Sequence, residues 1–279
     1  MSVLMVDYAT DDAPRLFTQS LRETGFAVLR GHPVSTDLIF EVYDLWREFF
    51  LNDLSMKNKY LFHRDTQDGY FPFRSENAKN NKISDLKEFF HIYPWGQIPE
   101  KARDASLRLY AILEKFSAEL LQWVENFLPS TVSAQLSMPL KDMITKSENT
   151  LLRVLHYPPL QEEDEKDAIR AAAHEDINLI TLLPAATTPG LEVLDANGNW
   201  HPVSCDPGNI VVNVGDMLQM CTQYYYKSTT HRVQNPSSEN NCSRFSMPLF
   251  LHPRKEVKLS ADYTAVEYLK ERLREIGIY

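Results

Sequence analysis

The chain has 279 residues, of which 43% are hydrophobic and 24% are charged, so it is long enough to bury a sizeable core in one large or two small globular domains. Its formal net charge of -9 argues against a nucleic-acid partner, because phosphate binding draws on clustered Lys and Arg that this sequence does not show. The longest apolar runs end well short of the roughly 20 residues that a membrane-spanning helix needs, which argues against a membrane protein.

The N-terminal residues carry acidic side chains early, at Asp7, Asp11 and Asp12, and show neither a basic segment nor a signal-peptidase site. A cytoplasmic location is therefore expected. The cysteines, Cys205, Cys221 and Cys242, are odd in number and widely scattered, which favours free thiols over a disulfide framework. Nothing in the sequence indicates an oligomeric state.

The first part of the chain predicts helices alternating with short strands. Its expected elements are a helix over residues 12–25 ended by Gly25, a strand over Phe26–Arg30, a helix over 35–51, a loop or short strand over Gly69–Arg74, a strand within Asp85–Ile92 and a helix over 102–128. Apolar residues recur at three- and four-residue steps in both long helices, which predicts one buried face for each. In the last helix that face would include Ile112 and Phe127.

After Leu151 the periodicity changes to that of strands. The expected strands are Leu151–Tyr157, Ile177–Leu183, Leu191–Leu194, Ile210–Val214, His231–Gln234 and Arg244–Leu251. Many short strands separated by turn signals predict an antiparallel sandwich or barrel. The acidic run Gln161–Asp167 is interpreted as a solvated loop or helix start, and residues 261–276 as an amphipathic helix packed on the body.

No linker or repeat interrupts the sequence, so we expect a single domain over 1–279. It would comprise a helical and β N-terminal module of about residues 1–130, a β-rich core of about 150–255 and the C-terminal helix.

His174 and Asp176 are two positions apart, just before an apolar run. On an extended strand, side chains at i and i+2 share a face, so an imidazole nitrogen and a carboxylate oxygen could converge. His231 could add the third ligand of a 2-His-1-carboxylate site, which holds Fe(II) and leaves positions open for substrate and O₂. The spacing alone is weak, since His63 and Asp65 repeat it in a polar stretch. The alternative is a surface turn or a local hydrogen-bonded pair.

Arg244 and Ser246 would share one face of a later strand. A guanidinium can hold a carboxylate with two parallel hydrogen bonds, and a hydroxyl can add one more. The alternative is an exposed arginine beside a solvated serine. Arg74 is a candidate partner for a substrate carboxylate. Side chains interpreted as structural are His32, His91, His156, His201, His252, Tyr70, Phe71, Phe73, Trp95 and Tyr224–Tyr226.

Together these residues resemble the Fe(II)- and 2-oxoglutarate-dependent dioxygenases of the isopenicillin N synthase-like family. The motifs that carry the resemblance, in order, are Glu23–Leu29, Asp85–Phe90, Tyr157-Pro158-Pro159, His174-x-Asp176, Val211–Asp216, Tyr226–Val233 and Arg244-x-Ser246. They cover nearly the whole chain and are specific in combination. The sequence departs from the pattern at Leu155, where many plant members have Asn, and at Asn178, where Gly is common. Arg244 also follows His231 by 13 positions, somewhat more than usual.

The resemblance implies a mainly β fold with flanking helices, built on a double-stranded β-helix, or jelly roll, of the cupin-like kind. It implies that His174, Asp176 and His231 bind Fe(II). It further implies that Arg244 and Ser246 bind the distal carboxylate of 2-oxoglutarate, with help from the hydroxyl of Tyr157. The implied activity consumes O₂, decarboxylates 2-oxoglutarate to succinate and oxidises a small-molecule substrate, most commonly by hydroxylation. Two alternatives remain open: an iron oxidase of the isopenicillin N synthase type that needs no 2-oxoglutarate, and a non-catalytic jelly-roll binding module.

Overall fold

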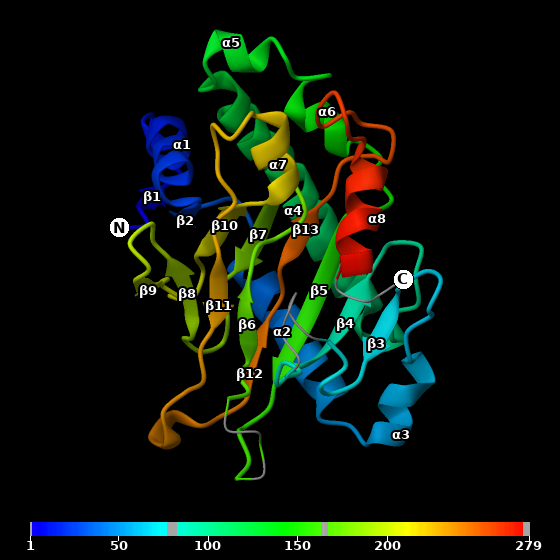
Figure 1. Ribbon diagram of the computed structural model, residues 1–279. Coiled ribbons are helices and arrows are strands. Elements are labelled where there is room, and N and C mark those ends of the chain that lie inside the picture. Colours follow the sequence, from blue (N-terminus) through cyan, green and yellow to red (C-terminus); the bar gives the residue numbers. More distant parts are fainter. Residues whose placement is uncertain (1, 77–82, 163, 165–166, 276–279) are drawn as a thin grey trace.

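The structure is a computed structural model that describes residues 2–76, 83–162, 164 and 167–275. Its strands form a nine-stranded and a four-stranded sheet (Figure 1). The strands are β1 Met5–Asp7, β2 Phe26–Arg30, β3 Gly69–Phe71, β4 Glu88–Ile92, β5 Leu151–Tyr157, β6 Ala171–His174, β7 Ile180–Pro184, β8 Leu191–Leu194, β9 Trp200–Pro202, β10 Ile210–Val214, β11 His231–Val233, β12 Arg244–Ser246 and β13 Leu249–Leu251.

The large sheet has the order β1-β2-β10-β7-β13-β5-β4-β3, with β12 also paired to β5, and the small sheet has the order β6-β11-β8-β9. The two N-terminal strands β1 and β2 pair in parallel, and the other described strand pairs are antiparallel. This two-sheet β core with flanking helices is the predicted jelly roll.

The helices are α1 Ala13–Thr24, α2 Thr36–Phe50, α3 Leu54–Lys57, α4 Glu100–Asn126, α5 Ser130–Ser133, α6 Leu140–Ile144, α7 Asp216–Cys221 and α8 Ala265–Glu275, with short 3₁₀ turns at Asn58–Tyr60 and Ser238–Asn240. In Figure 1, α2 and α4 lie behind the large sheet and β6, β8 and β11 lie in front of it. The small sheet therefore faces the side of the large sheet that these two helices leave free.

Alternation along β5 shows how one strand serves both faces. Leu152 and Val154 are fully buried in the core shared with α2 and α4. Leu155 and Tyr157 point to the other side and pack with Ala171 of the small sheet. Because side chains alternate along a strand, one face of the large sheet is closed by helices and the other forms the interior of the jelly roll.

The predicted helices are confirmed with small shifts at their ends. Gly25 ends α1 in the left-handed conformation, at φ 75°. The predicted buried face of α4 was too broad, since Ile112 and Phe127 are 38% and 41% exposed. The C-terminal helix starts only at Ala265, and the predicted position 276 lies outside the described residues. In the predicted acidic loop Gln161–Asp167, positions 163, 165 and 166 lie outside the described residues as well.

The strand predictions were right at β2, β5, β8 and β10 and, to within one residue, at β11, and the strand expected within Asp85–Ile92 is β4. Two predicted strands have other bounds in the structure, and three strands were missed. The expected strand Arg244–Leu251 is two strands, β12 and β13, separated at Met247 and Pro248, because proline has no N–H to give to a ladder. The strand expected from Ile177 begins only at Ile180. The strands β1, β6 and β9 were not predicted.

Over the part of the chain that the structure describes, every helix is too short or too polar to cross a bilayer. The three cysteines are free, as predicted.

Candidate metal centre

Two neighbouring strands of the small sheet place the candidate histidines. His174 is the last residue of β6 and His231 is the first residue of β11, and the two are direct partners in the antiparallel ladder. Asp176 lies beyond the end of β6, in the connection to β7. The expectation that His174 and Asp176 share one strand face was therefore wrong, although their side chains still converge.

The three side chains bring their ligand atoms together. His174 Nε2 lies 3.9 Å from Asp176 Oδ1, and His231 Nε2 lies 3.7 Å from the same oxygen. The imidazole ring centroids are 4.4 Å apart. Among the described residues, no further His, Cys, Asp or Glu joins this cluster. The three ligand atoms all lie within 4.8 Å of one another, so small side-chain rotations would bring them onto one ion.

The hydrogen bonds of His174 and His231 involve their Nδ1 atoms and leave their Nε2 atoms free to bind a metal. His174 Nδ1 faces the carbonyl of Ala172 at 2.8 Å, and His231 Nδ1 faces the carbonyl of Thr229 at 3.1 Å. Each Nδ1 therefore donates its proton, and each Nε2 presents a lone pair to the cluster. Burial, followed by repulsion from His231, lowers the pKa of His174 to about 4, so this imidazole is neutral at pH 7. Neutral imidazole is the form that binds a metal.

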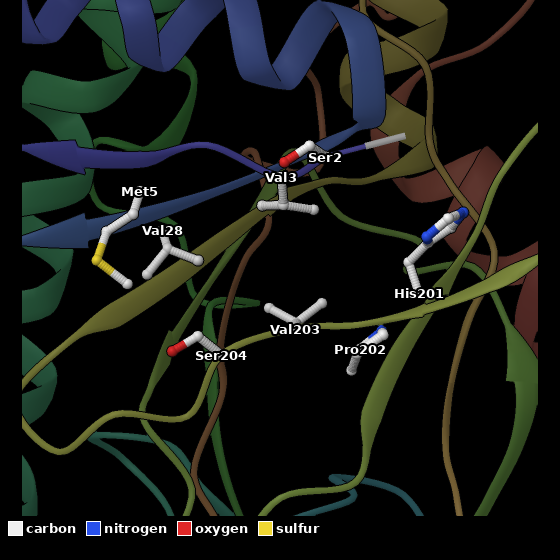
Figure 2. A pocket seen from close by; sticks show the side chains of 8 residues that line it. All are labelled: Ser2, Val3, Met5, Val28, His201, Pro202, Val203 and Ser204. Atoms are coloured by element: carbon white, nitrogen blue, oxygen red, sulfur yellow. The ribbon is translucent and has the colours of Figure 1, made fainter.

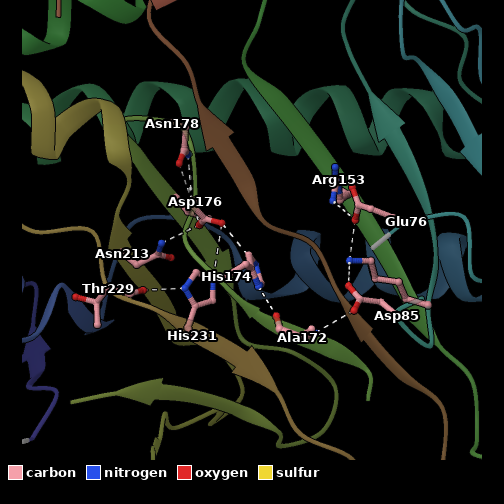
Figure 3. Close-up of polar contacts among 12 residues, drawn as sticks. Glu76, Asp85, Arg153, Ala172, His174, Asp176, Asn178, Asn213, Thr229 and His231 are labelled. Atoms are coloured by element: carbon pink, nitrogen blue, oxygen red, sulfur yellow. Dashed lines mark hydrogen bonds and ion pairs between the residues drawn. The ribbon is translucent and has the colours of Figure 1, made fainter. Parts of the chain in front are cut away.

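The two oxygens of the Asp176 carboxylate have different partners. Its Oδ2 accepts hydrogen bonds from Thr181 Oγ1 at 2.6 Å and from Asn213 Nδ2 at 2.8 Å (Figure 3). Its Oδ1 faces the two imidazoles. Burial alone would raise the pKa of Asp176, but His231, His174 and these hydrogen bonds outweigh it and keep the pKa below its ordinary value. The donor set of two imidazoles and one anchored carboxylate fits Fe(II).

A second hydrogen-bond chain supports His174 from the other side. The N–H of Ala172 donates to Asp85 Oδ1 at 3.0 Å, while the carbonyl of Ala172 accepts from His174 (Figure 3). Asp85 Oδ2 is also bound by Lys87 Nζ at 2.7 Å. Asp85 therefore fixes the peptide that orients the imidazole.

The same network continues away from the metal centre. Glu76 accepts from Lys87 at 2.7 Å and from Arg153 at 3.1 Å. Burial opposes ionisation of Glu76, but these two cations hold its pKa well below the ordinary value.

Sequence reasoning gave no role to Asp85, Thr181 or Asn213. The available signal was a polar side chain inside an apolar strand, as in Val211-Val212-Asn213-Val214.

Arg244, Ser246 and Tyr157 lie together in the interior. Arg244 pairs with Tyr157 across β12 and β5, and its guanidinium lies 5.1 Å from the centre of the Tyr157 ring. Arg244 is 2% exposed and Ser246 is 4% exposed. The Nε of Arg244 donates to the carbonyl of Thr188 at 3.1 Å, whereas its buried Nη1 has no hydrogen-bond partner. A buried guanidinium with a spare donor fits the carboxylate of a keto acid.

The remaining candidates lie elsewhere. Arg74 is paired with Asp164 at 2.7 Å. The control histidine, His63, contacts Asp68 at 3.1 Å and not Asp65. The five histidines interpreted as structural stay outside the metal cluster. Tyr224, Phe73 and Trp95, which were expected to pack inside, are 63%, 40% and 50% exposed.

A hollow of about 240 Å³ lies where the N-terminal residues meet the end of β9 (Figure 2). The described residues that line it include Val3, Val28, His201 and Val203 and none of the candidate metal or carboxylate ligands. It is a surface feature separate from the cluster.

Two family sequence profiles match the chain. Residues 148–253 match the profile described as "2OG-Fe(II) oxygenase superfamily", and residues 7–112 match the one described as "non-haem dioxygenase in morphine synthesis N-terminal". The first range contains all six candidate ligands.

Individual proteins agree with these profiles. The chain is 32% identical to the 2-oxoglutarate-Fe(II) type oxidoreductase hxnY of Emericella nidulans, with 87% of this chain and 76% of the relative covered. It is 47% identical to a Shewanella oneidensis protein of known structure, provisionally named an oxygenase, with a TM-score of 0.90 and 100% of both chains covered. A full-length Neurospora crassa protein, solved in complex with alpha-KG and thymine, shares the fold, with a TM-score of 0.79, 19% identity, and coverage of 98% of this chain and 96% of that one.

Proposed function

The chain belongs to the 2OG-Fe(II) oxygenase superfamily and is an oxygenase that depends on Fe(II) and 2-oxoglutarate, and on this premise we propose which residues bind each of them and what kind of substrate is oxidised. The proposed iron ligands are His174, Asp176 and His231. The proposed 2-oxoglutarate-binding residues are Arg244, Ser246 and Tyr157.

The observation that carries the iron proposal is the convergence of three ligand atoms from two strands and a connection. Two Nε2 atoms face one carboxylate oxygen at 3.9 and 3.7 Å. Hydrogen bonds to the opposite atoms of each ligand fix all three orientations before any ion is bound. Three protein ligands leave half of an octahedral coordination sphere for the reactants.

When bound, Fe(II) and 2-oxoglutarate supply the oxidation: O₂ is consumed, the keto acid becomes succinate and CO₂, and a C–H bond of the substrate is oxidised. The protein contributes position and environment. Arg244 would neutralise the far carboxylate of the keto acid, and the orphaned Nη1 would gain a partner. Tyr157 and Ser246 would add hydroxyl donors from the same interior face. Apolar side chains such as Phe89 would exclude water.

We further propose a small molecule as the substrate and hydroxylation as the outcome. On the face of β5 that also carries Tyr157, aromatic rings lie next to a cation: the Arg153 guanidinium lies 4.5 Å from the ring centre of Phe89 and 5.6 Å from that of Phe250. Such a face suits a compact ligand with an apolar body. The net charge of -9 also disfavours a nucleic-acid polymer as substrate.

A cytoplasmic location is proposed as well, because the three free cysteines suit a reducing compartment.

The test combines iron binding with product formation. His174→Ala should weaken Fe(II) binding by at least tenfold under anaerobic conditions and abolish succinate formation from 2-oxoglutarate. His63→Ala is the matched control, because it removes a histidine from the same His-x-Asp spacing outside the cluster. Unchanged Fe(II) binding in His174→Ala, measured in a folded protein, would refute the proposed ligand set. Once iron binding is established, a succinate-coupled screen of small metabolites identifies the substrate.

A further inference from the structure

A second arginine is buried close to Arg244. Arg170 immediately precedes β6 and is 1% exposed, and both arginines are among the largest fully buried side chains of the protein. Sequence reasoning gave Arg170 no role. A guanidinium is always charged at physiological pH, so its complete burial needs a reason.

The contacts of Arg170 leave part of its charge unused. Its backbone N–H donates to Asn235 Oδ1 at 3.0 Å, and its Nη2 donates to the carbonyl of Cys242 at 2.5 Å. Its Nε is buried and has no hydrogen-bond partner. One carbonyl accepts one hydrogen bond and carries no net charge, so the cation is not neutralised.

Arg170 and Arg244 share one region of the interior. The Cys242 carbonyl that Arg170 binds lies two residues before Arg244 in the chain. Burial lowers the pKa of Arg170, and repulsion from the Arg244 guanidinium is the next cause of that shift. Across the described residues, neither guanidinium lies within 4.0 Å of an Asp or Glu oxygen. Thr188, whose carbonyl binds Arg244, also has a buried hydroxyl without a partner.

This arrangement contrasts with the other buried charges of the interior. Lys87 and Arg153 are each paired with a carboxylate. Two buried cations without a carboxylate partner repel each other and lose hydration, and both effects are unfavourable. An anion bound between them would remove both penalties, and unsatisfied donors on both guanidinium groups are present to bind it.

We propose that Arg170 is a second guanidinium of the 2-oxoglutarate subsite, so that the distal carboxylate is bound by two arginines, Arg170 and Arg244. This inference rests on the proposed function, because it takes Arg244 as the first carboxylate ligand. A doubled positive charge makes the subsite selective for keto acids that carry a distal carboxylate.

The test compares two keto acids that differ only at the far end. Binding of 2-oxoglutarate and of 2-oxopentanoate, which has the same carbon chain without the distal carboxylate, is measured by anaerobic calorimetry on the protein loaded with Mn(II). Arg170→Gln keeps a donor for the Cys242 carbonyl and removes the charge. It should weaken 2-oxoglutarate by about tenfold to a hundredfold and change 2-oxopentanoate by less than about twofold.

Two further variants separate charge from structure. Arg170→Lys retains the cation and should bind 2-oxoglutarate several-fold more tightly than Arg170→Gln does. Arg254→Gln is the matched control: Arg254 also donates to backbone carbonyls, those of Asp142 and Thr145, in a different part of the protein. The control should leave both affinities unchanged.

The outcomes distinguish this inference from the proposed function. If Arg170→Lys and Arg170→Gln bind 2-oxoglutarate equally, or if Arg170→Gln weakens both keto acids by the same factor, Arg170 has only a structural role. If Arg244→Gln also leaves the preference for 2-oxoglutarate intact, the carboxylate subsite itself is misassigned. Loss of selectivity in Arg244→Gln alone retains the proposed function and overturns the role of Arg170.

Discussion

The hydroxyl of Thr181 tests how much the metal centre depends on groups that never touch the metal. Thr181 is 2% exposed, and its Oγ1 donates to Asp176 Oδ2 at 2.6 Å and accepts from Asn178 Nδ2 at 3.0 Å. Thr181→Val preserves the shape of the side chain and removes both interactions. Asn213 would remain as a donor to Asp176 Oδ2.

The expected effect has two parts. A hydrogen bond to a charged group contributes about 1.5–3 kcal/mol, so the free energy of unfolding of the metal-free protein should fall by about that amount. With only one anchor left, Asp176 can rotate its Oδ1 away from the imidazoles, and a loss of an orienting partner typically weakens metal binding by about tenfold to a hundredfold.

The assay pairs urea unfolding of the metal-free protein with anaerobic Fe(II) titration. Thr181→Ser is the control, because it keeps the hydroxyl and should restore most of the metal affinity. The reasoning is refuted if Thr181→Val binds Fe(II) as tightly as the unchanged protein does. A stability loss without an affinity loss would mean that Asn213 alone orients the carboxylate.

Two other substitutions test the scaffold. A Cβ on Gly25, which has φ 75°, would lie 2.2 Å from Thr229 Oγ1. Gly25→Ala should therefore lower both thermal stability and Fe(II) affinity. The control is Gly198→Ala, at φ 84° in open space, which should show only the backbone strain of about 1 kcal/mol. Equal stability losses in the two variants would contradict this. Burial, then the charge of Arg153, holds the pKa of His91 well below its usual value, so only the unfolded chain takes up a proton there as pH falls below about 6.5. The free energy of unfolding should therefore fall by up to about 1.4 kcal/mol per pH unit below that pH. Urea unfolding at pH 7 and pH 5 should show that His91→Gln loses less stability between the two pH values than the unchanged protein does. An identical loss in both proteins would exclude His91 as a source of acid sensitivity.

The sequence predicted the elements whose signals are local. The helix that ends at Gly25 and the strand Leu151–Tyr157 were predicted closely, because capping glycine and period-two alternation are properties of the segment itself. β6 was missed, since Ala171-Ala172-Ala173 has a low β propensity and is held in the sheet by β11.

The convergence of the metal ligands was predicted for a reason that turned out to be incomplete. Asp176 is not on the strand of His174, and the ladder between β6 and β11 is irregular, with His174 opposite His231 but Ala171 opposite Val233. Register irregularities depend on contacts between strands far apart in sequence. The family motifs indicated that His231 joins His174 and Asp176, and the spacing of these residues in the sequence could not indicate this.

The charged side chains of the interior show why function is hard to separate from structure in a sequence. Lys87 and Arg170 are both cations beside apolar strands. Lys87 follows one of its partners, Asp85, by two positions, but its second partner, Glu76, is not evident from the sequence, and neither is the surrounding of Arg170. In the fold, Lys87 meets Asp85 and Glu76, so its charge is balanced and its contribution is to hold the peptide that orients His174. Arg170 meets a carbonyl and has an unpaired Nε, so its charge is not balanced within the described protein. A buried charge that has no partner within the protein indicates where an ionic ligand binds. The sequence alone does not reveal such a charge, because the partner of every neighbouring charge must be known first.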